Sequence, residues 1–405
     1  MWKPRGYVVV RRLCIAGLYG LGAASLVCAA ESLYEDVVPT VRPIAETLPV
    51  PTDDDAADDP AIWVNPTDPS ASLIIGTDKK AGLGVYRLDG SLVNFYQLGP
   101  QNNVDIRSDV VLSPGFRAMN IVASSDREDH TFRLFELATN GSLIEVGARL
   151  FPTELREAYG ICLHHSETTG HTHVFINDKG GRVEQWRLFA EGAPLRPRVG
   201  AALVRTFQVG GQPEGMTADD ELGWLYVGEG RTGIWRYHAE PWTHPEEHPF
   251  SLDESDHERE PVEFVGPHGR LTADVEGVDI ARMGDAGGLL LVSSQSADRF
   301  DVFERAYPYR FVGSFRIGAG FDASGEQIDA VTHTDGLAVC AGDVGPSLPG
   351  GVVVVQDDEN PGGTQNFKIV PLSSVLAALG LTEDAERQAA SVDATEIQGK
   401  EDATP

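Results

Sequence analysis

The sequence predicts an all-β fold, a six-bladed β-propeller whose blades are four-stranded antiparallel sheets. Two observations support this prediction. A pair of short apolar runs recurs six times along the 405 residues, and a strand that opens with a polar residue precedes each pair. Repeats of this length, with several short strands each, are typical of propeller blades. The 44 glycines and 25 prolines supply the turns between so many strands.

The two apolar runs predict the middle strands of each blade, because short uninterrupted apolar segments bounded by turns are typical of buried strands. The first runs begin at Leu73, Asn120, His173, Trp224, Leu289 and Gly351. The second runs are Leu83–Leu88, Phe132–Leu137, Arg182–Leu188, Gly233–Tyr237, Arg299–Phe303 and Asn366–Val370.

The preceding strands predict the innermost position of each blade. Their opening residues are spaced by 50, 50, 55, 62 and 59 positions and are expected to form one ring at one mouth of the central channel. Four of them are followed by glycine, which permits a close approach of neighbouring backbones. The six opening residues, five of them carboxylates, are Asp59, Asp109, Tyr159, Glu214, Glu276 and Asp335.

An outer strand follows in five repeats and is missing from the sixth, where a helix-like segment, Leu372–Leu381, takes its place. Val37–Ile44 has the right character to supply the missing strand, and its two prolines suit only an edge. The N-terminal segment is therefore expected to close the ring. The other outer strands are expected at Phe95–Leu98, Ala148–Phe151, Arg205–Val209, Val262–Val265 and Ser314–Ile317.

Residues 1–30 are predicted to be a signal peptide. A basic start is followed by an apolar stretch, Leu13–Val27, and by a small-residue cleavage site at residues 28–30. The protein is therefore expected to be secreted or periplasmic; whether Cys28 carries a lipid stays open. Residues 31–381 are expected to form a single propeller domain, and residues 382–405 a disordered polar tail.

The charge balance limits the classes of partner. With 61 acidic against 32 basic residues, the formal net charge is −29, which argues against nucleic acid and against an anionic membrane surface. The chain is expected to be a monomer that binds cations. Cys162 and Cys340 remain after signal removal and are expected on inner strands of opposite blades, too far apart for a disulfide.

The acid ring predicts a metal site, because carboxylates crowded at one mouth do not all stay ionised without cations. Oxygen ligands in a flexible array favour calcium. Alternatively, these acids simply cap strands and accept hydrogen bonds from loops. Further acids expected near this mouth are Asp58, Asp274, Asp329 and Glu229.

Basic residues follow the first apolar run in three consecutive repeats and are expected at the same mouth. They are Lys79, Lys80, Arg127 and Lys179. Calcium together with lysine and arginine suits a polyanion, whose phosphate oxygens accept charge-assisted hydrogen bonds. A histidine group at 164, 165, 171 and 173 offers zinc or phosphohistidine chemistry, but a solvated blade loop is the favoured interpretation.

Six motifs together resemble the β-propeller phytases, in one order over residues 38–381. They are Asp58–Trp63 (DDPAIW), Thr77–Leu83 (TDKKAGL), Asn102–Arg107 (NNVDIR), Glu214–Glu221 (EGMTADDE), Asp274–Gly277 (DVEG) and Gln365–Pro371 (QNFKIVP). The resemblance implies a calcium-dependent enzyme that hydrolyses phytate, myo-inositol hexakisphosphate, through attack by a metal-activated water. One departure from the family pattern is Gly230, where the family often has another acid; another is Gly180-Gly181-Arg182.

The resemblance also implies roles for individual residues. The implied catalytic calcium ligands are Asp58, Glu214, Glu229, Asp274, Glu276 and Asp335. The implied structural calcium ligands are Glu46, Asp59, Pro60, Val104, Asp329, Asp357, Asp358 and Asn360. The implied phosphate-binding residues are Lys79, Lys80, Arg127, Tyr159 and Lys179. Two alternatives stay open: a calcium-dependent propeller lactonase or phosphotriesterase, and a non-enzymatic extracellular calcium-binding propeller.

Overall fold

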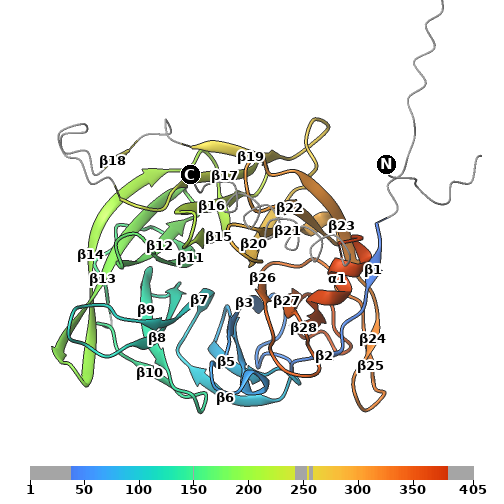
Figure 1. The fold of residues 1–405 in the computed structure, drawn as a ribbon, viewed down its shortest axis with the longest axis horizontal. Helices are drawn as coiled ribbons and strands as arrows, with labels where there is room; N and C mark the ends of the chain where they lie inside the picture. Colours follow the sequence, from blue (N-terminus) through green and yellow to red (C-terminus); the bar gives the residue numbers. More distant parts are fainter. Residues whose placement is uncertain (1–37, 149, 242–252, 255–258, 382–405) are drawn as a thin grey trace, which may run out of the picture. The chain divides into compact units, whose positions relative to one another are not determined.

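The computed structural model describes residues 38–381, apart from 149, 242–252 and 255–258. The predicted signal peptide and C-terminal tail lie outside the described residues. Within the described part, six antiparallel sheets surround a central channel, with the first strand of each blade innermost (Figure 1). The predicted six-bladed propeller is confirmed.

Each blade runs outward in chain order from its inner strand. Blade one is β3(Ala57–Trp63), β4(Leu73–Asp78), β5(Gly82–Arg87) and β6(Leu92–Gln97). Blade two is β7(Gln101–Val110), β8(Met119–Asp126), β9(Thr131–Leu137) and β10(Leu143–Glu145). Blade three is β11(Ala158–His165), β12(Thr172–Asp178), β13(Arg182–Ala193) and β14(Arg196–Gln208), with β18(Asp253–Glu254) parallel to β14.

The second half of the chain repeats this plan. Blade four is β15(Pro213–Asp219), β16(Trp224–Glu229), β17(Gly233–His238) and β19(Glu260–Phe264). Blade five is β20(Val275–Arg282), β21(Gly288–Ser294), β22(Arg299–Glu304) and β23(Phe311–Ile317). Blade six is β26(Leu337–Ala341), β27(Gly351–Asp357), β28(Asn366–Pro371) and β2(Ala45–Glu46). A small hairpin, β24(Gly320–Phe321) with β25(Gln327–Ile328), and the helix α1(Leu372–Ala378) complete the described elements.

The middle strands carry the core, as their apolar runs predicted. Every residue of β12 and of β27 is buried. The apolar clusters lie between neighbouring blades; one of them joins Leu291 and Phe300 of blade five to Val353 and Val355 of blade six. A fully buried Val, Leu or Phe side chain contributes about 1.5–3 kcal/mol. Each blade is therefore stabilised mainly by its neighbours, which holds the inner strands in fixed positions around the channel.

The N-terminal segment closes the ring, but with different residues from those predicted. Ala45–Glu46, not Val37–Ile44, forms the outer strand of blade six, in antiparallel register with Ile369 and Lys368. Thr40–Val41 forms β1, which instead pairs in parallel with β23 of blade five. Pro43 separates the two short strands and cannot donate a ladder hydrogen bond. The segment thus ties blade five to blade six.

Two further strand predictions were wrong, both in blade two. Its outer strand is Leu143–Glu145 rather than Ala148–Phe151. Its inner strand begins at Gln101, so Asp109 lies near the far end of the strand, is exposed and has a φ of 56°. Asp109 is therefore not a member of the ring. Polar residues dominate β7, so no apolar run marks where it begins.

The loop interpretation of the histidine group holds only for His171, which is exposed between β11 and β12. His164 and His173 are cross-strand partners on β11 and β12, and both are fully buried. Their rings stack with centroids 5.7 Å apart. The thiols agree with the prediction, because Cys162 and Cys340 are both free. No helix within the described residues is long and apolar enough to cross a membrane.

Candidate active site

Strand register defines the ring at the mouth of the channel. In blades one to five the first residue of the inner strand pairs with the last residue of the second strand, as Ala57 does with Asp78 and Pro213 with Glu229. The next residue in each of these five inner strands is then the ring position, and in blade six Asp335 lies two residues before β26 begins at Leu337. In blades one and two this gives Asp58 and Asn102 in place of Asp59 and Asp109. The ring is Asp58, Asn102, Tyr159, Glu214, Glu276 and Asp335.

Glycines bring the ring residues together. A Cβ atom built at Gly215 would lie 2.5 Å from the carbonyl oxygen of Glu276, and one at Gly336 would lie 2.6 Å from the carbonyl oxygen of Asp58. Only glycine permits these backbone contacts between neighbouring blades. Four carboxylates consequently border a cavity of about 10 Å³, roughly the size of one water molecule or small ion. They are Asp58, Glu214, Glu276 and Asp335.

Burial makes ionisation of this cluster unfavourable. It raises the pKa of Asp58 to about 7, with the charges of Asp335 and Glu214 adding to the effect and Lys79 opposing it. Burial likewise raises the pKa of Glu214 to about 7 and that of Glu276 well above its ordinary value. The pKa of Asp335 is also raised by burial, against the pull of Lys79. A bound cation would reverse these shifts, because it favours the ionised form.

Three side chains donate hydrogen bonds to, or pair with, the ring carboxylates. The sequence analysis had missed two of them and had assigned the third, Lys79, to phosphate binding. The Lys79 ammonium lies 2.8 Å from Asp335 and 3.3 Å from Asp58, and also pairs with Asp55, so it is a buried counter-ion. Gln295 Nε2 donates to Asp335 at 2.5 Å, and Gln212 Nε2 donates to Glu214 Oε1 at 2.5 Å. Gln295 directly follows β21, just as Lys79 directly follows β4 in blade one. This equivalent position in the repeat is the sequence signal that could have assigned Gln295 to the site.

The remaining predicted phosphate-binding residues line the rim. Lys80 is exposed and donates to the Asp53 carbonyl oxygen. Arg127 donates to Asn102 of the ring at 3.0 Å. Arg127 and Lys179 both lie over the Tyr159 ring, at 5.7 and 4.8 Å from its centroid. Tyr159 therefore joins two rim cations to the acid cluster.

The other two predicted catalytic ligands lie beside the cavity rather than on it. Glu229 is buried and accepts a hydrogen bond from Trp235 Nε1 at 2.6 Å. Asp274 precedes β20, and its Oδ1 lies 3.6 Å from Arg231 Nε. A Cβ atom built at Gly230 would lie 3.4 Å from Glu214 Oε1 and 3.8 Å from Asp274 Cβ. Asp274 is therefore next to the ring, whereas Glu229 is directed toward Trp235.

The predicted structural calcium ligands form two groups. In the first, oxygens of four residues surround the buried ammonium of Lys368: Glu46, Asp329, Asp357 and Asn360. Three carboxylates against one ammonium leave an excess of two negative charges (three minus one), which a further cation would balance. Asp358 instead accepts from Gln365 and lies close to His333 and Glu359.

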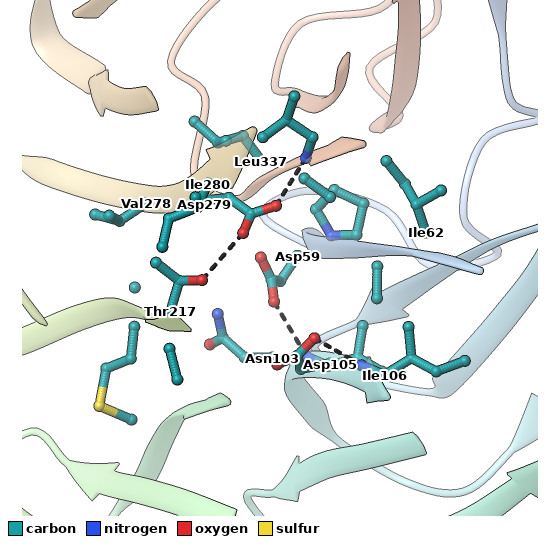
Figure 2. Close-up of a pocket in the computed structure, with 18 of the residues that line it drawn as sticks. Asp59, Ile62, Asn103, Asp105, Ile106, Thr217, Val278, Asp279, Ile280 and Leu337 are labelled. Carbon is teal, nitrogen blue, oxygen red and sulfur yellow. Dashed lines mark hydrogen bonds between the residues drawn. The ribbon is translucent and has the colours of Figure 1, made fainter. Parts of the chain in front are cut away.

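The second group lies deeper in the channel, where Asp59, Pro60 and Val104 border a cavity of about 240 Å³. Figure 2 shows that Asp105 and Asp279, which the sequence analysis missed, reach the same cavity from other blades. Asp279 accepts from Thr217 and from the Val339 amide of blade six. Burial raises the pKa of Asp279 to about 6. These acids therefore also link neighbouring inner strands.

One polar atom at the mouth indicates a cation site directly. Among the described side chains, Glu214 Oε2 is buried without a hydrogen-bond partner, although Glu214 borders the small cavity. If all four ring carboxylates are ionised, Lys79 leaves an excess of three negative charges (four minus one). The donors that border the cavity are oxygens, which suit calcium or magnesium. The residues present therefore fit a hard divalent cation.

Fold and site define a β-propeller with a buried carboxylate ring at one mouth of its channel and a basic rim around it. Comparison with known proteins identifies the family: the phytase family profile matches residues 10–395. The chain belongs to the phytase family, and it is an enzyme of that family. The non-enzymatic alternative is thereby set aside.

A characterised relative supports the same assignment. The chain is 36% identical over 352 residues to the 3-phytase of Bacillus subtilis (strain 168), covering 85% of this chain and 86% of that protein. A functionally unknown protein from Desulfotomaculum acetoxidans DSM 771 also matches in structure, with a TM-score of 0.40 and 11% identity. That match covers 63% of this chain and 70% of the other, and its TM-score is too low to inform function.

Proposed function

We propose that this phytase releases inorganic phosphate from phytate in a calcium-dependent reaction outside the cytoplasm. The observation that carries the proposal is the unsatisfied, buried Glu214 Oε2 in a ring of four carboxylates, with a lysine and arginine rim directly around it. The name of the Bacillus subtilis relative, a 3-phytase, supports phytate as the substrate. The basic and apolar N-terminal segment supports export.

The rim residues bind the substrate. Lys80, Arg127 and Lys179 donate charge-assisted hydrogen bonds to phosphate oxygens and offset the repulsion between an acidic protein and a polyanion. Tyr159 holds Arg127 and Lys179 over its ring, which places both cations at one side of the mouth. Phosphate binding at this rim brings a phosphoryl group next to the carboxylate ring.

The ring residues hold the metal. Asp58, Glu214, Glu276 and Asp335, with Asp274 at the edge, would hold calcium, which when bound would lower the pKa of a water and offset charge on the phosphoryl oxygens. Lys79, Gln212 and Gln295 orient three of these carboxylates through the contacts described above. Of the described residues that border the small cavity, none is Ser, Cys or His, which supports water as the nucleophile.

Structural calcium is part of the same proposal. The group around Lys368 and the group at Asp59 each link segments far apart in the sequence, and a cation at either would strengthen closure of the ring. Glu229 enters this proposal only as a neighbour of the ring, because its carboxylate contacts Trp235.

The test is release of inorganic phosphate from phytate by the purified protein in calcium and after exhaustive chelation. We expect turnover with calcium and none without it. Parallel assays with an aryl lactone and an aryl phosphotriester address the remaining alternative class. Hydrolysis of either of those with no release from phytate would overturn the proposal, as would full phytate turnover in excess chelator.

A further inference from the structure

The loops that join the second and third strands of each blade all lie at the mouth. In blades one, three and four these loops have three residues and the same turn. The amide of the third loop residue donates to the carbonyl of the last strand residue, as Ala81 does to Asp78, Gly181 to Asp178 and Thr232 to Glu229. Lys80 is the middle residue in blade one, and Arg231 is the middle residue in blade four.

The match between these two loops extends to the next strand. Gly82 and Gly233 begin β5 and β17 with φ values of 150° and 147°. In both, an added Cβ atom would meet the carbonyl oxygen of the outer strand, at 1.9 Å from Tyr96 and 2.1 Å from Glu263. The backbone therefore presents Arg231 from blade four as it presents Lys80 from blade one.

The surroundings of Arg231 leave its guanidinium accessible. Its side chain is 91% exposed, and its Nε lies 3.6 Å from Asp274 Oδ1. An ion pair this exposed contributes only about 0–1 kcal/mol to stability. The contact with Asp274 therefore does not compete strongly with a phosphate for the Arg231 guanidinium. The preceding residue, Gly230, accepts a hydrogen bond from the Val275 amide at 2.8 Å and lies against Glu214 of the ring. Arg231 thus extends from the edge of the cation site.

We propose that Arg231 is a substrate-contact residue that binds a second phosphate group of a polyphosphorylated substrate. The proposal rests on the proposed function. Blades one to four each present a cation in this loop, whereas blades five and six present amide, hydroxyl or acidic residues. A ligand with several phosphates spans this arc, and a single phosphate does not. The arc is Lys80, Arg127, Lys179 and Arg231.

The experiment compares Arg231→Ala with a matched control, Arg310→Ala. Arg310 is also an exposed arginine, 73% accessible, with a carboxylate, Glu304, at 3.7 Å. It lies in the loop between the third and fourth strands, at the opposite end of blade five. Both variants lose one exposed positive charge, so only position relative to the mouth differs.

For Arg231→Ala we expect the KM for phytate to rise roughly fivefold, because one charge-assisted hydrogen bond to phosphate is lost. The kcat should be nearly unchanged, because the phosphate that Arg231 binds is not the one that reacts. Inhibition by inorganic phosphate should be unaltered, because a single phosphate binds elsewhere on the rim. The salt dependence of KM should weaken. Arg231→Lys keeps the charge without the planar fork and should fall between parent and Arg231→Ala. Arg310→Ala should match the parent.

Equal KM values for Arg231→Ala and Arg310→Ala would overturn the proposal, and so would an equal loss of affinity for phytate and for inorganic phosphate. Melting temperatures of both variants, measured in calcium, show whether a loss comes from unfolding. A parent protein that releases no phosphate from phytate would instead refute the proposed function itself, so the two failures are distinguishable.

Discussion

The ammonium of Lys79 lies 2.8 Å from the carboxylate of Asp335, across 256 positions of sequence, and joins blade one to blade six. Only 8% of the lysine side chain is exposed. Burial alone would lower the pKa of Lys79, but Asp58 and Asp335 raise it above its ordinary value. Lys79 is therefore charged and serves as counter-ion to the ring, unlike its exposed neighbour Lys80.

The first prediction separates these two lysines. Lys79→Met should destabilise the fold by about 3 kcal/mol, because it leaves two buried carboxylates without their counter-ion. Lys80→Met should leave stability unchanged and raise the KM for phytate. Urea unfolding in chelator, followed by phytate assays in calcium, measures both effects. Equal unfolding midpoints for the two variants would show that Lys79 is only another rim cation.

The fold and much of the ring follow from the sequence because each leaves a local pattern. The apolar runs mark buried middle strands, and the acid–glycine pairs at Glu214, Glu276 and Asp335 mark close contacts between inner strands. The inner strand of blade two, β7, carries neither an apolar run nor an acid–glycine pair. It is polar and contains two register shifts, at Gln101/Val104 and Arg107/Val110. Register depends on backbone pairing, so the pattern at Asp109 pointed to the wrong segment.

Other features of the site depend on contacts that only the closed ring creates. Lys368 gathers acids from distant parts of the chain; the apolar run around it predicts a buried strand but gives no sign of these partners. Asp105 and Asp279 reach one cavity from two blades (Figure 2). His164 and His173 look like a polar loop until β11 and β12 pair. Such features are products of tertiary packing rather than of local sequence preference.

The second prediction concerns closure of the ring. Removing residues up to 48 deletes the outer strand of blade six, including the bond from the Ile44 amide to the Ile369 carbonyl at 2.9 Å. It also removes Glu46 from Lys368. We expect loss of cooperative unfolding or a large fall in melting temperature, measured by calorimetry. Glu46→Gln keeps the strand and should cost much less. A truncated chain as stable as the parent would contradict closure by this segment.

The third prediction concerns the thiols. Burial raises the pKa of Cys340 to about 11 and that of Cys162 well above its ordinary value. Neither thiol is then a reactive thiolate at neutral pH. We expect a maleimide reagent to modify neither in the native protein and both in guanidinium, as read by intact mass. A native mass two daltons lower, indicating a disulfide, would contradict the assigned positions of β11 and β26.

The fourth prediction concerns acid stability. Burial, aided by nearby His164 and His171, lowers the pKa of His173 to about 3. The unfolded chain takes up this proton near pH 6.5, so stability conferred by the neutral ring is present above that pH and is lost as pH falls toward 3. The loss is at most about 1.4 kcal/mol per pH unit. His173→Phe should flatten this part of the stability profile, whereas His171→Phe, which removes only one of the contributions to the shift, should change it much less.

The last prediction tests the metal through stability as well as turnover. The ligands bind calcium only when ionised, and the unfolded chain lacks the assembled ring, so calcium stabilises the folded state. Above its dissociation constant, each tenfold rise in free calcium should add about 1.4 kcal/mol per site. Melting temperature should therefore climb with free calcium in the parent protein, measured in a chelator-buffered series.

Asp335→Asn should reduce both that climb and phytate turnover, because an amide brings no charge to the ring. Asp322→Asn is the matched control; Asp322 lies in the exposed β24–β25 turn, where it accepts hydrogen bonds from Ser324 and Glu326. It should retain the parent's calcium response and turnover. A melting temperature independent of calcium in the parent, or full turnover by Asp335→Asn, would mean that the carboxylate ring does not hold the metal.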